Sequence, residues 1–197
     1  MVKICVFCSS TDGLSQDYID AAKKMGQLLG EQGHHLVYGG SHRGLMGEVS
    51  RNFAEHSNEI TEIIPKMWTD LVVGKGNTII TEDFGERLKK MQFHSDAFIA
   101  LPGGFGSLHE IMDVLVAKQL KFHDKPLVLV NTNGIFNPII EQIKNIISEG
   151  LAPKDNHPFL YAVNTPEEAL EYIENYVLTE VCAHASVPSE EGKKCGA

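Results

Sequence analysis

The chain has 197 residues, of which 43% are hydrophobic and 22% are charged, and this composition is typical of one globular domain with a full apolar core. No apolar run is long enough to cross a membrane, and the first residues lack a signal-peptide pattern, so we expect a cytoplasmic protein with no membrane partner. The formal net charge is −9 and no long basic run is present, so we expect no nucleic-acid partner.

The four cysteines and nine histidines form no pattern that is typical of a metal site. Cys5 and Cys8 have Cys-x-x-Cys spacing, but both fall in an apolar strand pattern. Residues three apart on a strand face opposite sides, so these two thiols are poorly placed to act as a pair. We expect them to be core or strand-end thiols of a cytosolic protein, and we predict no metal site.

Strand and helix patterns alternate through the first half of the chain. Short apolar runs predict strands at residues 2–7, 35–38 and 59–64. Helical spacing predicts helices at 15–32, from the glycine-rich turn at 39–47 to about 56, and at 84–93. Residues 65–80, which include Trp68, have no clear period, and we expect an irregular connection there.

Small residues follow the first two predicted strands. Ser9 and Ser10 come soon after the first strand, and Gly39 and Gly40 come directly after the second. The carboxyl ends of parallel strands commonly line a ligand crevice, and glycine-rich turns into helices bind phosphate. We therefore predict that these four residues contribute to a binding site.

The stretch 97–117 carries the strongest functional signal. Residues 97–101 predict a buried parallel strand, Pro102 ends it, and a helical pattern begins at Leu108. The turn between them offers free backbone N–H groups and a positive helix end, which together suit a phosphate. The predicted phosphate-binding residues are Gly103, Gly104, Phe105, Gly106 and Ser107.

The spacing of Ser107 and Glu110 has two interpretations. Ser107 is at the expected helix N-cap and Glu110 follows three residues later, as in a capping box. Alternatively, the Glu110 carboxylate is within reach of whatever molecule the turn holds. Spacing alone favours the capping box.

The second half of the chain continues the alternation. Strands are predicted at 126–130 and 159–163, and helices at 135–148 and 165–176, the last with a start signal at Thr165, Pro166 and Glu168. We expect residues 1–178 to form one Rossmann-like nucleotide-binding domain and 179–197 to be a disordered tail.

The order of these patterns predicts the fold class. Strands that alternate with helices indicate a doubly wound, mostly parallel sheet in a three-layer αβα arrangement. The first turn lacks the G-x-G-x-x-G fingerprint, which argues against a nicotinamide or flavin dehydrogenase.

The glycine motifs resemble those of the LONELY GUY (LOG) family. Residues 102–110, Pro-Gly-Gly-Phe-Gly-Ser-Leu-His-Glu, are similar to its PGGxGTxxE motif, and residues 38–40 with 44–47 are similar to its second glycine motif. The segments 5–10 and 123–126 also match, so the similarity covers about residues 4 to 165. The resemblance implies a homodimeric cytokinin riboside 5′-monophosphate phosphoribohydrolase, which cleaves a nucleoside monophosphate to free base and ribose 5-phosphate without a cofactor.

The resemblance also implies a catalytic pair. The family's arginine and glutamate map to Arg87 and Glu110, which shifts the interpretation of Glu110 from capping to catalysis. Departures from the family pattern at Leu88, His109 and Ala117 bear on base preference.

Two other functions remain open at this point. A non-catalytic nucleotide-binding or carrier protein on the same fold would need only the glycine turns. A lysine decarboxylase would need a pyridoxal phosphate lysine, and nothing marks Lys118, Lys121 or Lys125 as one.

Overall fold

The structure is a computed structural model that describes residues 1–72, 74, 76–153 and 159–185. Its core is a sheet of seven strands in the order β4-β3-β2-β1-β5-β6-β7, and each pair of neighbours is parallel. The strands are β1 (Lys3–Phe7), β2 (His35–Tyr38), β3 (Ile60–Pro65), β4 (Asn77–Thr81), β5 (Ala97–Ala100), β6 (Leu127–Val130) and β7 (Tyr161–Val163).

Within the described residues, six α-helices and two short 3₁₀ helices precede or follow the strands. The α-helices are α1 (Gln16–Glu31), α2 (Gly44–Phe53), α3 (Phe84–Phe93), α4 (Phe105–Gln119), α5 (Asn137–Ser148) and α6 (Pro166–Ala185). The 3₁₀ helices are η1 (Lys66–Leu71) after β3 and η2 (Thr132–Gly134) after β6.

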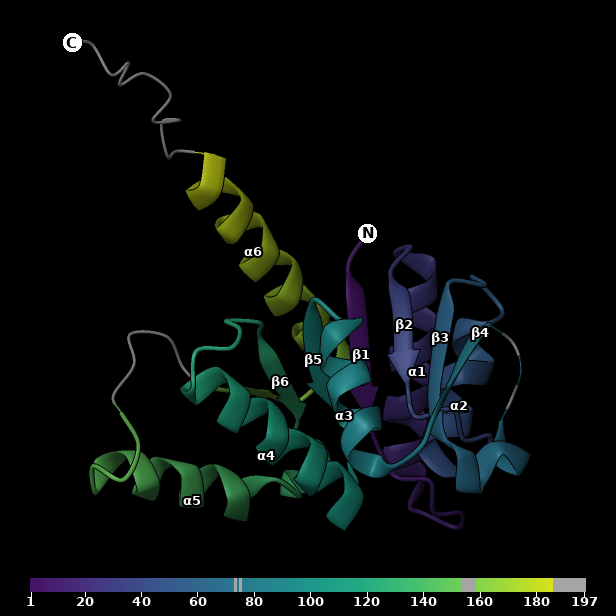
Figure 1. Ribbon diagram of the computed structural model, residues 1–197, viewed down its shortest axis with the longest axis horizontal. Coiled ribbons are helices and arrows are strands. Elements are labelled where there is room, and N and C mark those ends of the chain that lie inside the picture. Colours follow the sequence, from purple (N-terminus) through teal and green to yellow (C-terminus); the bar gives the residue numbers. More distant parts are fainter. Residues whose placement is uncertain (73, 75, 154–158, 186–197) are drawn as a thin grey trace, which may run out of the picture.

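The helices cover both faces of the sheet, and each face has its own apolar core. One core joins α1, α2 and α6 to the sheet, and the other joins α3, α4 and α5 to the opposite face. Figure 1 shows α3 and α4 in front of the sheet and α1 and α2 behind it. Strands β1, β5 and β6 read as continuous apolar runs because both of their faces are buried. The predicted three-layer αβα fold is confirmed.

The strand order places a crevice between β1 and β5. From β1 the chain winds outward through β2, β3 and β4, and it then returns to β5 on the other side of β1. Such a switch point opens a crevice at the carboxyl ends of the two central strands. The segments that follow these strands are therefore brought together: Ser9 N donates to the carbonyl oxygen of Pro102 at 3.1 Å.

Local signals explain where several helices begin. Asp83 caps α3 by accepting a hydrogen bond from the backbone N–H of Glu86 at 2.8 Å, and the predicted bounds of α3 are those observed. Thr165 and Glu168 form a capping box at α6, in which each side chain accepts from the other's backbone N–H at 3.3 Å.

Several predicted boundaries are wrong. Residues 65–80 are not irregular throughout, since they include η1 and the edge strand β4. The helix after residue 135 begins only at Asn137, behind η2. Helix α6 continues to Ala185, so residues 179–185, predicted to lie in a disordered tail, are helical; residues 186–197 are outside the described residues.

Candidate active site

A cleft of about 240 Å³ lies at the carboxyl ends of β1 and β5. The segment after β1, the start of α4, and side chains from α2, η1 and α3 contribute to its walls. Its lining residues are Cys8, Ser9, Ser10, Thr11, Met46, Trp68, Phe84, Arg87, Gly104, Phe105, Gly106, Ser107 and Glu110. The predicted catalytic pair, both predicted serines after β1 and most of the predicted phosphate turn therefore meet in one place.

The amino end of α4 opens directly into this cleft. Gly104 is the N-cap, and the first bond of the helix runs from Leu108 N to the carbonyl oxygen of Gly104 at 3.0 Å. The backbone N–H groups of Phe105, Gly106 and Ser107 precede that bond, so helix geometry leaves them without helical partners. A Cβ at Gly104 or Gly106 would meet no atom within 4 Å, because it would project into open space. This helix end has the free donors and the room that a phosphate requires.

The expected start of α4 is wrong, and the capping box is wrong with it. The helix begins at Phe105 rather than Leu108, which makes Ser107 the third helical residue and not the N-cap. Ser107 is buried, and its Oγ occupies the space that a Cβ on Gly103 would need. Gly103 is thus absent from the cleft lining and instead makes room for Ser107.

Glu110 pairs with Arg87 and does not cap its own helix. The Arg87 Nη1 donates to Glu110 Oε1 at 2.6 Å, and both side chains are only 5% exposed. Arg87 Nε donates to the carbonyl oxygen of Ile63 at 3.1 Å, and its guanidinium lies 5.7 Å from the centre of the Phe84 ring. The arginine side chain is therefore held in place by groups on β3 and α4. The sequence pattern of its helix does not indicate that Arg87 is buried.

The second carboxylate oxygen of Glu110 has no hydrogen-bond partner among the described residues. Burial raises the pKa of Glu110 above its ordinary value, and the adjacent positive charge of Arg87 opposes that rise. Buried polar atoms are normally hydrogen-bonded, so an unpartnered carboxylate oxygen in a cleft lining marks a point where a ligand can bind.

The second glycine turn, which was predicted to contribute to the binding site, lies behind the cleft lining rather than in it. Gly39 and Gly40 are buried and are absent from the cleft lining. A Cβ on Gly39 would overlap Nη2 of Arg87, whereas Gly40 has a φ of 78°, in the left-handed region that favours glycine. The structure therefore places Gly39 against Arg87, a member of the predicted catalytic pair.

Three apolar residues in the lining were not predicted. Trp68 from η1 and Phe84 from α3 meet edge to face with ring centroids 5.0 Å apart, and Met46 from α2 lines the same cleft. The available signal was a single tryptophan in a long connection, since such connections often carry function. An apolar wall opposite polar groups is the usual composition of a small-molecule site.

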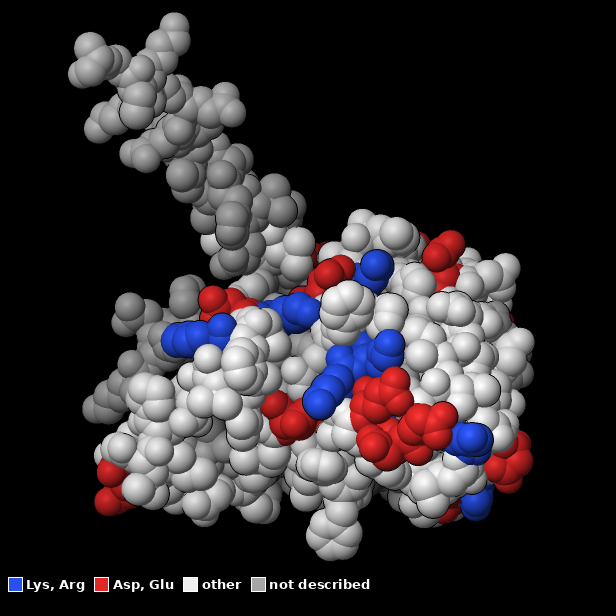
Figure 2. All heavy atoms as spheres, in the orientation of Figure 1, with Lys and Arg blue, Asp and Glu red and all other residues white. Residues whose placement is uncertain are grey.

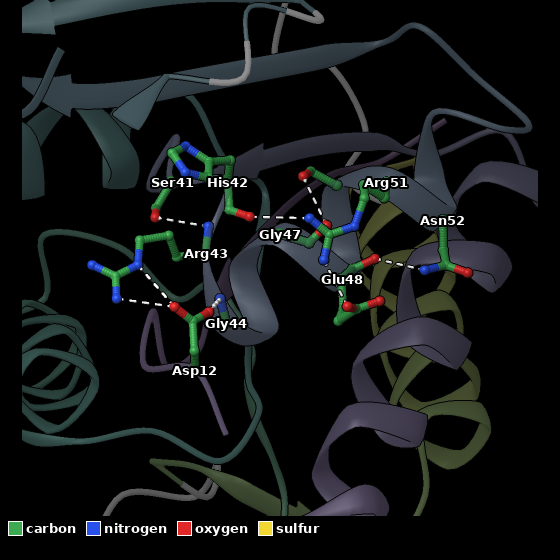
Figure 3. Close-up of polar contacts among 10 residues, drawn as sticks. Asp12, Ser41, His42, Arg43, Gly44, Gly47, Glu48, Arg51 and Asn52 are labelled. Carbon is green, nitrogen blue, oxygen red and sulfur yellow. Dashed lines mark hydrogen bonds and ion pairs between the residues drawn. The ribbon is translucent and has the colours of Figure 1, made fainter. Parts of the chain in front are cut away.

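A second cavity of about 340 Å³ adjoins the cleft and shares Thr11 with it. Figure 3 shows that its charged groups are paired with one another. Asp12 accepts from Arg43 Nε and from the backbone N–H of Gly44, both at 2.9 Å. Arg51 donates to the carbonyl oxygen of His42 at 3.0 Å and to Glu48 at 2.6 Å. These contacts hold the turn into α2, which explains two of the three arginines of the chain.

Other features of the described residues bear on the remaining functional classes. No lysine is found among the described residues that line the cleft. Within the described ranges, no group of three or more His, Cys, Asp or Glu residues is placed to hold a metal ion. The described helices include none that is long and apolar enough to cross a membrane. On the face shown in Figure 2, acidic and basic side chains lie next to one another rather than in one broad basic area.

Comparisons with known proteins give close sequence relatives. A family profile described as "Possible lysine decarboxylase" matches residues 46–173. The cytokinin riboside 5′-monophosphate phosphoribohydrolase LOG5 of Arabidopsis thaliana is 39% identical over 178 residues, which cover 88% of this chain and 78% of the relative. LOG3 of Arabidopsis thaliana is 36% identical over 91% of this chain and 88% of its own length.

Solved structures share the fold at lower identity. The molybdenum cofactor binding protein of Rippkaea orientalis has a TM-score of 0.71 at 21% identity and covers 89% of this chain and 97% of its own. The Moco carrier protein of Chlamydomonas reinhardtii has a TM-score of 0.70 at 19% identity, covering 90% and 98%. The extent of the sequence matches shows that the chain belongs to the LOG family of cytokinin riboside 5′-monophosphate phosphoribohydrolases.

Proposed function

We propose that the protein is an N-glycosidase that cleaves a purine nucleoside 5′-monophosphate to free base and ribose 5-phosphate. The substrate would be a cytokinin riboside monophosphate, as in the names of the relatives, or AMP. One observation carries the proposal: the buried Arg87–Glu110 pair lines the same cleft as the amino end of α4, and it leaves one carboxylate oxygen without a protein partner.

The chemistry follows from the placement of these groups. Positive charge develops on the ribose as its bond to the base stretches, and the Glu110 carboxylate is placed to stabilise that charge, orient a ribose hydroxyl or activate water. Arg87 keeps Glu110 oriented and favours its ionised form. The amides at the start of α4 would bind the phosphate, and this remote contact would position the scissile bond. The base would lie against Trp68, Phe84 and Met46.

The alternative is a protein that binds or carries a nucleotide without cleaving it. Such a protein would need the amide donors of α4, but it would have no use for a buried ion pair. Burying two charges adds little net stability relative to apolar residues of similar size, because desolvation opposes their attraction. The pair is therefore better explained by chemistry in the cleft than by stability.

Incubation with AMP and with isopentenyladenosine monophosphate, followed by chromatography of the free base, tests the proposal. Hydrolysis predicts base release that requires both Arg87 and Glu110. Tight binding of either nucleotide with no base release would support the carrier instead, and would contradict the proposed activity.

Two further features belong to the proposal. The family resemblance and the partly exposed apolar side of α4 and α5 support a homodimer: α5 has no fully buried residue, and Val116 on α4 is 48% exposed.

Cys5 and Cys8 are buried and unpaired, which supports a reducing compartment such as the cytoplasm.

A further inference from the structure

Gly39 follows β2 and lies against the guanidinium of Arg87. A Cβ built on this glycine would overlap Arg87 Nη2 and would lie 3.1 Å from the sulfur of Met46. No other atoms are as close to that position. The space beside Gly39 is therefore occupied by two residues that line the active-site cleft.

The backbone conformation of Gly39 does not require glycine. Its φ is outside the positive range, whereas the adjacent Gly40 has a φ of 78°. An alanine at position 39 would therefore meet no backbone strain, unlike an alanine at position 40. The only demand at position 39 is for space, and that space holds Arg87 and Met46.

Arg87 has no simple way to move aside. Its Nε is bonded to the carbonyl oxygen of Ile63 and its Nη1 to Glu110, so the guanidinium plane is fixed on two edges and Gly39 lies at the third. A methyl group at position 39 would push Nη2 away and rotate or withdraw the whole planar group. The bond to Glu110 at 2.6 Å would then lengthen or break.

We propose that Gly39 is a positioning residue, whose missing side chain lets Arg87 hold Glu110 in its catalytic orientation. Gly39 acts through Arg87 and does not contact substrate. This role rests on the proposed hydrolysis, and it replaces the predicted contact of Gly39 with phosphate. A displacement on the order of 1 Å at a catalytic group typically costs roughly 10²-fold in rate. We expect Gly39→Ala to lower kcat by about that factor, with a much smaller change in KM.

A double-mutant cycle separates this role from a structural one. Gly39→Ala, Arg87→Ala and the double variant are compared by kcat for base release from AMP. If Gly39 acts through Arg87, adding Gly39→Ala to Arg87→Ala changes kcat by less than about twofold, because the group that it displaces is gone. A full loss on both backgrounds would overturn the role, and so would a loss that Met46→Ala relieves.

The pH profile gives a second readout that a structural role would not move. Arg87 holds down the pKa of Glu110 against the effect of burial, so displacing the guanidinium would raise that pKa further. The acidic limb of kcat for Gly39→Ala should therefore shift to higher pH than in the wild-type enzyme. An unchanged limb would contradict the role. Gly85→Ala, on the same helix as Arg87, is the matched control, because a Cβ there would meet only Asp83, at 3.4 Å. This variant should leave kcat and the pH profile unchanged.

Stability measurements keep the test decisive if Gly39→Ala folds poorly. If alanine at position 39 destabilises the protein only by overlapping Arg87, the double variant should have the same thermal unfolding temperature as Arg87→Ala alone. Equal destabilisation on both backgrounds would show that alanine disturbs the fold itself and would overturn the role. If the wild-type protein binds AMP without releasing base, the proposed hydrolysis fails, and the same cycle scored by the AMP dissociation constant still tests whether Gly39 acts through Arg87.

Discussion

Oε1 of Glu110 lies 2.6 Å from Nη1 of Arg87, and this pair joins two helices, α3 and α4, in the lining of the candidate active-site cleft. Both side chains are 5% exposed, so neither charge has water as a ready partner. Each group is therefore held in one orientation by the other. The pair combines a fixed carboxylate with a cation that favours its ionised form, which is what the proposed hydrolysis would use.

Removing either member of the pair should abolish most of the activity. We expect Glu110→Gln and Arg87→Ala each to lower kcat/KM for AMP by at least roughly 10²-fold, the low end for the loss of an acid–base group. Lys89→Ala, an exposed change on the same helix as Arg87, is the control and should have wild-type activity. Steady-state base release measures all three, and near-wild-type turnover in Glu110→Gln would show that its carboxylate is not catalytic.

The Arg87–Glu110 pair should also contribute to the free energy of unfolding. Arg87→Ala leaves a buried carboxylate without its counter-charge, and breaking a buried pair in this way typically costs about 3–5 kcal/mol. Adding Glu110→Gln removes the uncompensated charge, so the double variant should be more stable than Arg87→Ala alone. Urea unfolding at neutral pH measures the free energies, and strictly additive losses would mean that the two residues are not coupled.

As pH rises and Glu110 ionises, activity should increase, whereas the free energy of unfolding should decrease. Burial raises its pKa above the ordinary 4.5, so the active, ionised form is lost as pH falls through a value above 4.5. The folded state binds this proton more tightly than the unfolded state, so ionisation lowers stability as pH rises through the same window. The acidic limb of kcat/KM and the pH slope of the unfolding free energy, relative to Glu110→Gln, measure the two effects. An acidic limb governed by an unshifted glutamate would contradict this prediction.

The sequence predicted those parts of the fold that short-range patterns determine. Continuous apolar runs marked β1, β2, β5 and β6, because these strands are buried on both faces. Strand β4 was missed because it is a short edge strand that pairs only with β3, so its residues are mostly not buried and form no apolar run. Its existence depends on the neighbouring strand rather than on its own sequence.

At the site, sequence identified the residues but not their contacts. Motif resemblance selected Arg87 and Glu110. The burial of Arg87, however, depends on contacts with Ile63, Gly39 and Phe84. Ile63 and Gly39 are distant from Arg87 in the sequence, and the sequence pattern did not indicate a contact with Phe84. The capping interpretation failed because Ser107 fits against Gly103 inside the first turn, which lets α4 begin at Phe105. Spacing of Ser107 and Glu110 alone contains no information about that contact.

A dimer in solution is the expected assembly. Apolar side chains stay exposed at the carboxyl end of α4 and just beyond it, with Val116 at 48%, Leu120 at 56% and Phe122 at 78%. A second copy that covered this side would remove that surface from water. Light scattering should give a mass near twice 21.7 kDa at micromolar concentration. A monomeric mass under conditions of full activity would contradict the prediction.

The phosphate of the substrate should account for a large part of the specificity. The N–H groups of Phe105, Gly106 and Ser107 lie at the amino end of α4, and hydrogen bonds to a charged group contribute about 1.5–3 kcal/mol each. Losing two of them would cost about 3–6 kcal/mol, or roughly two to four orders of magnitude in kcat/KM. We therefore expect AMP to be hydrolysed far faster than adenosine, and isopentenyladenosine monophosphate far faster than isopentenyladenosine.

Two further measurements separate this phosphate site from general affinity for nucleotides. Gly106→Ala would place a methyl group in the open space where the phosphate is expected, so it should raise KM for AMP with little effect on KM for adenosine. ATP should be a poor substrate, because a helix end that binds one terminal phosphate must exclude two more. Gly85→Ala is the control, since a Cβ there would meet only Asp83 at 3.4 Å. Equal kcat/KM for nucleoside and monophosphate would mean that the amino end of α4 does not bind the substrate phosphate, even if Arg87 and Glu110 are both required for turnover.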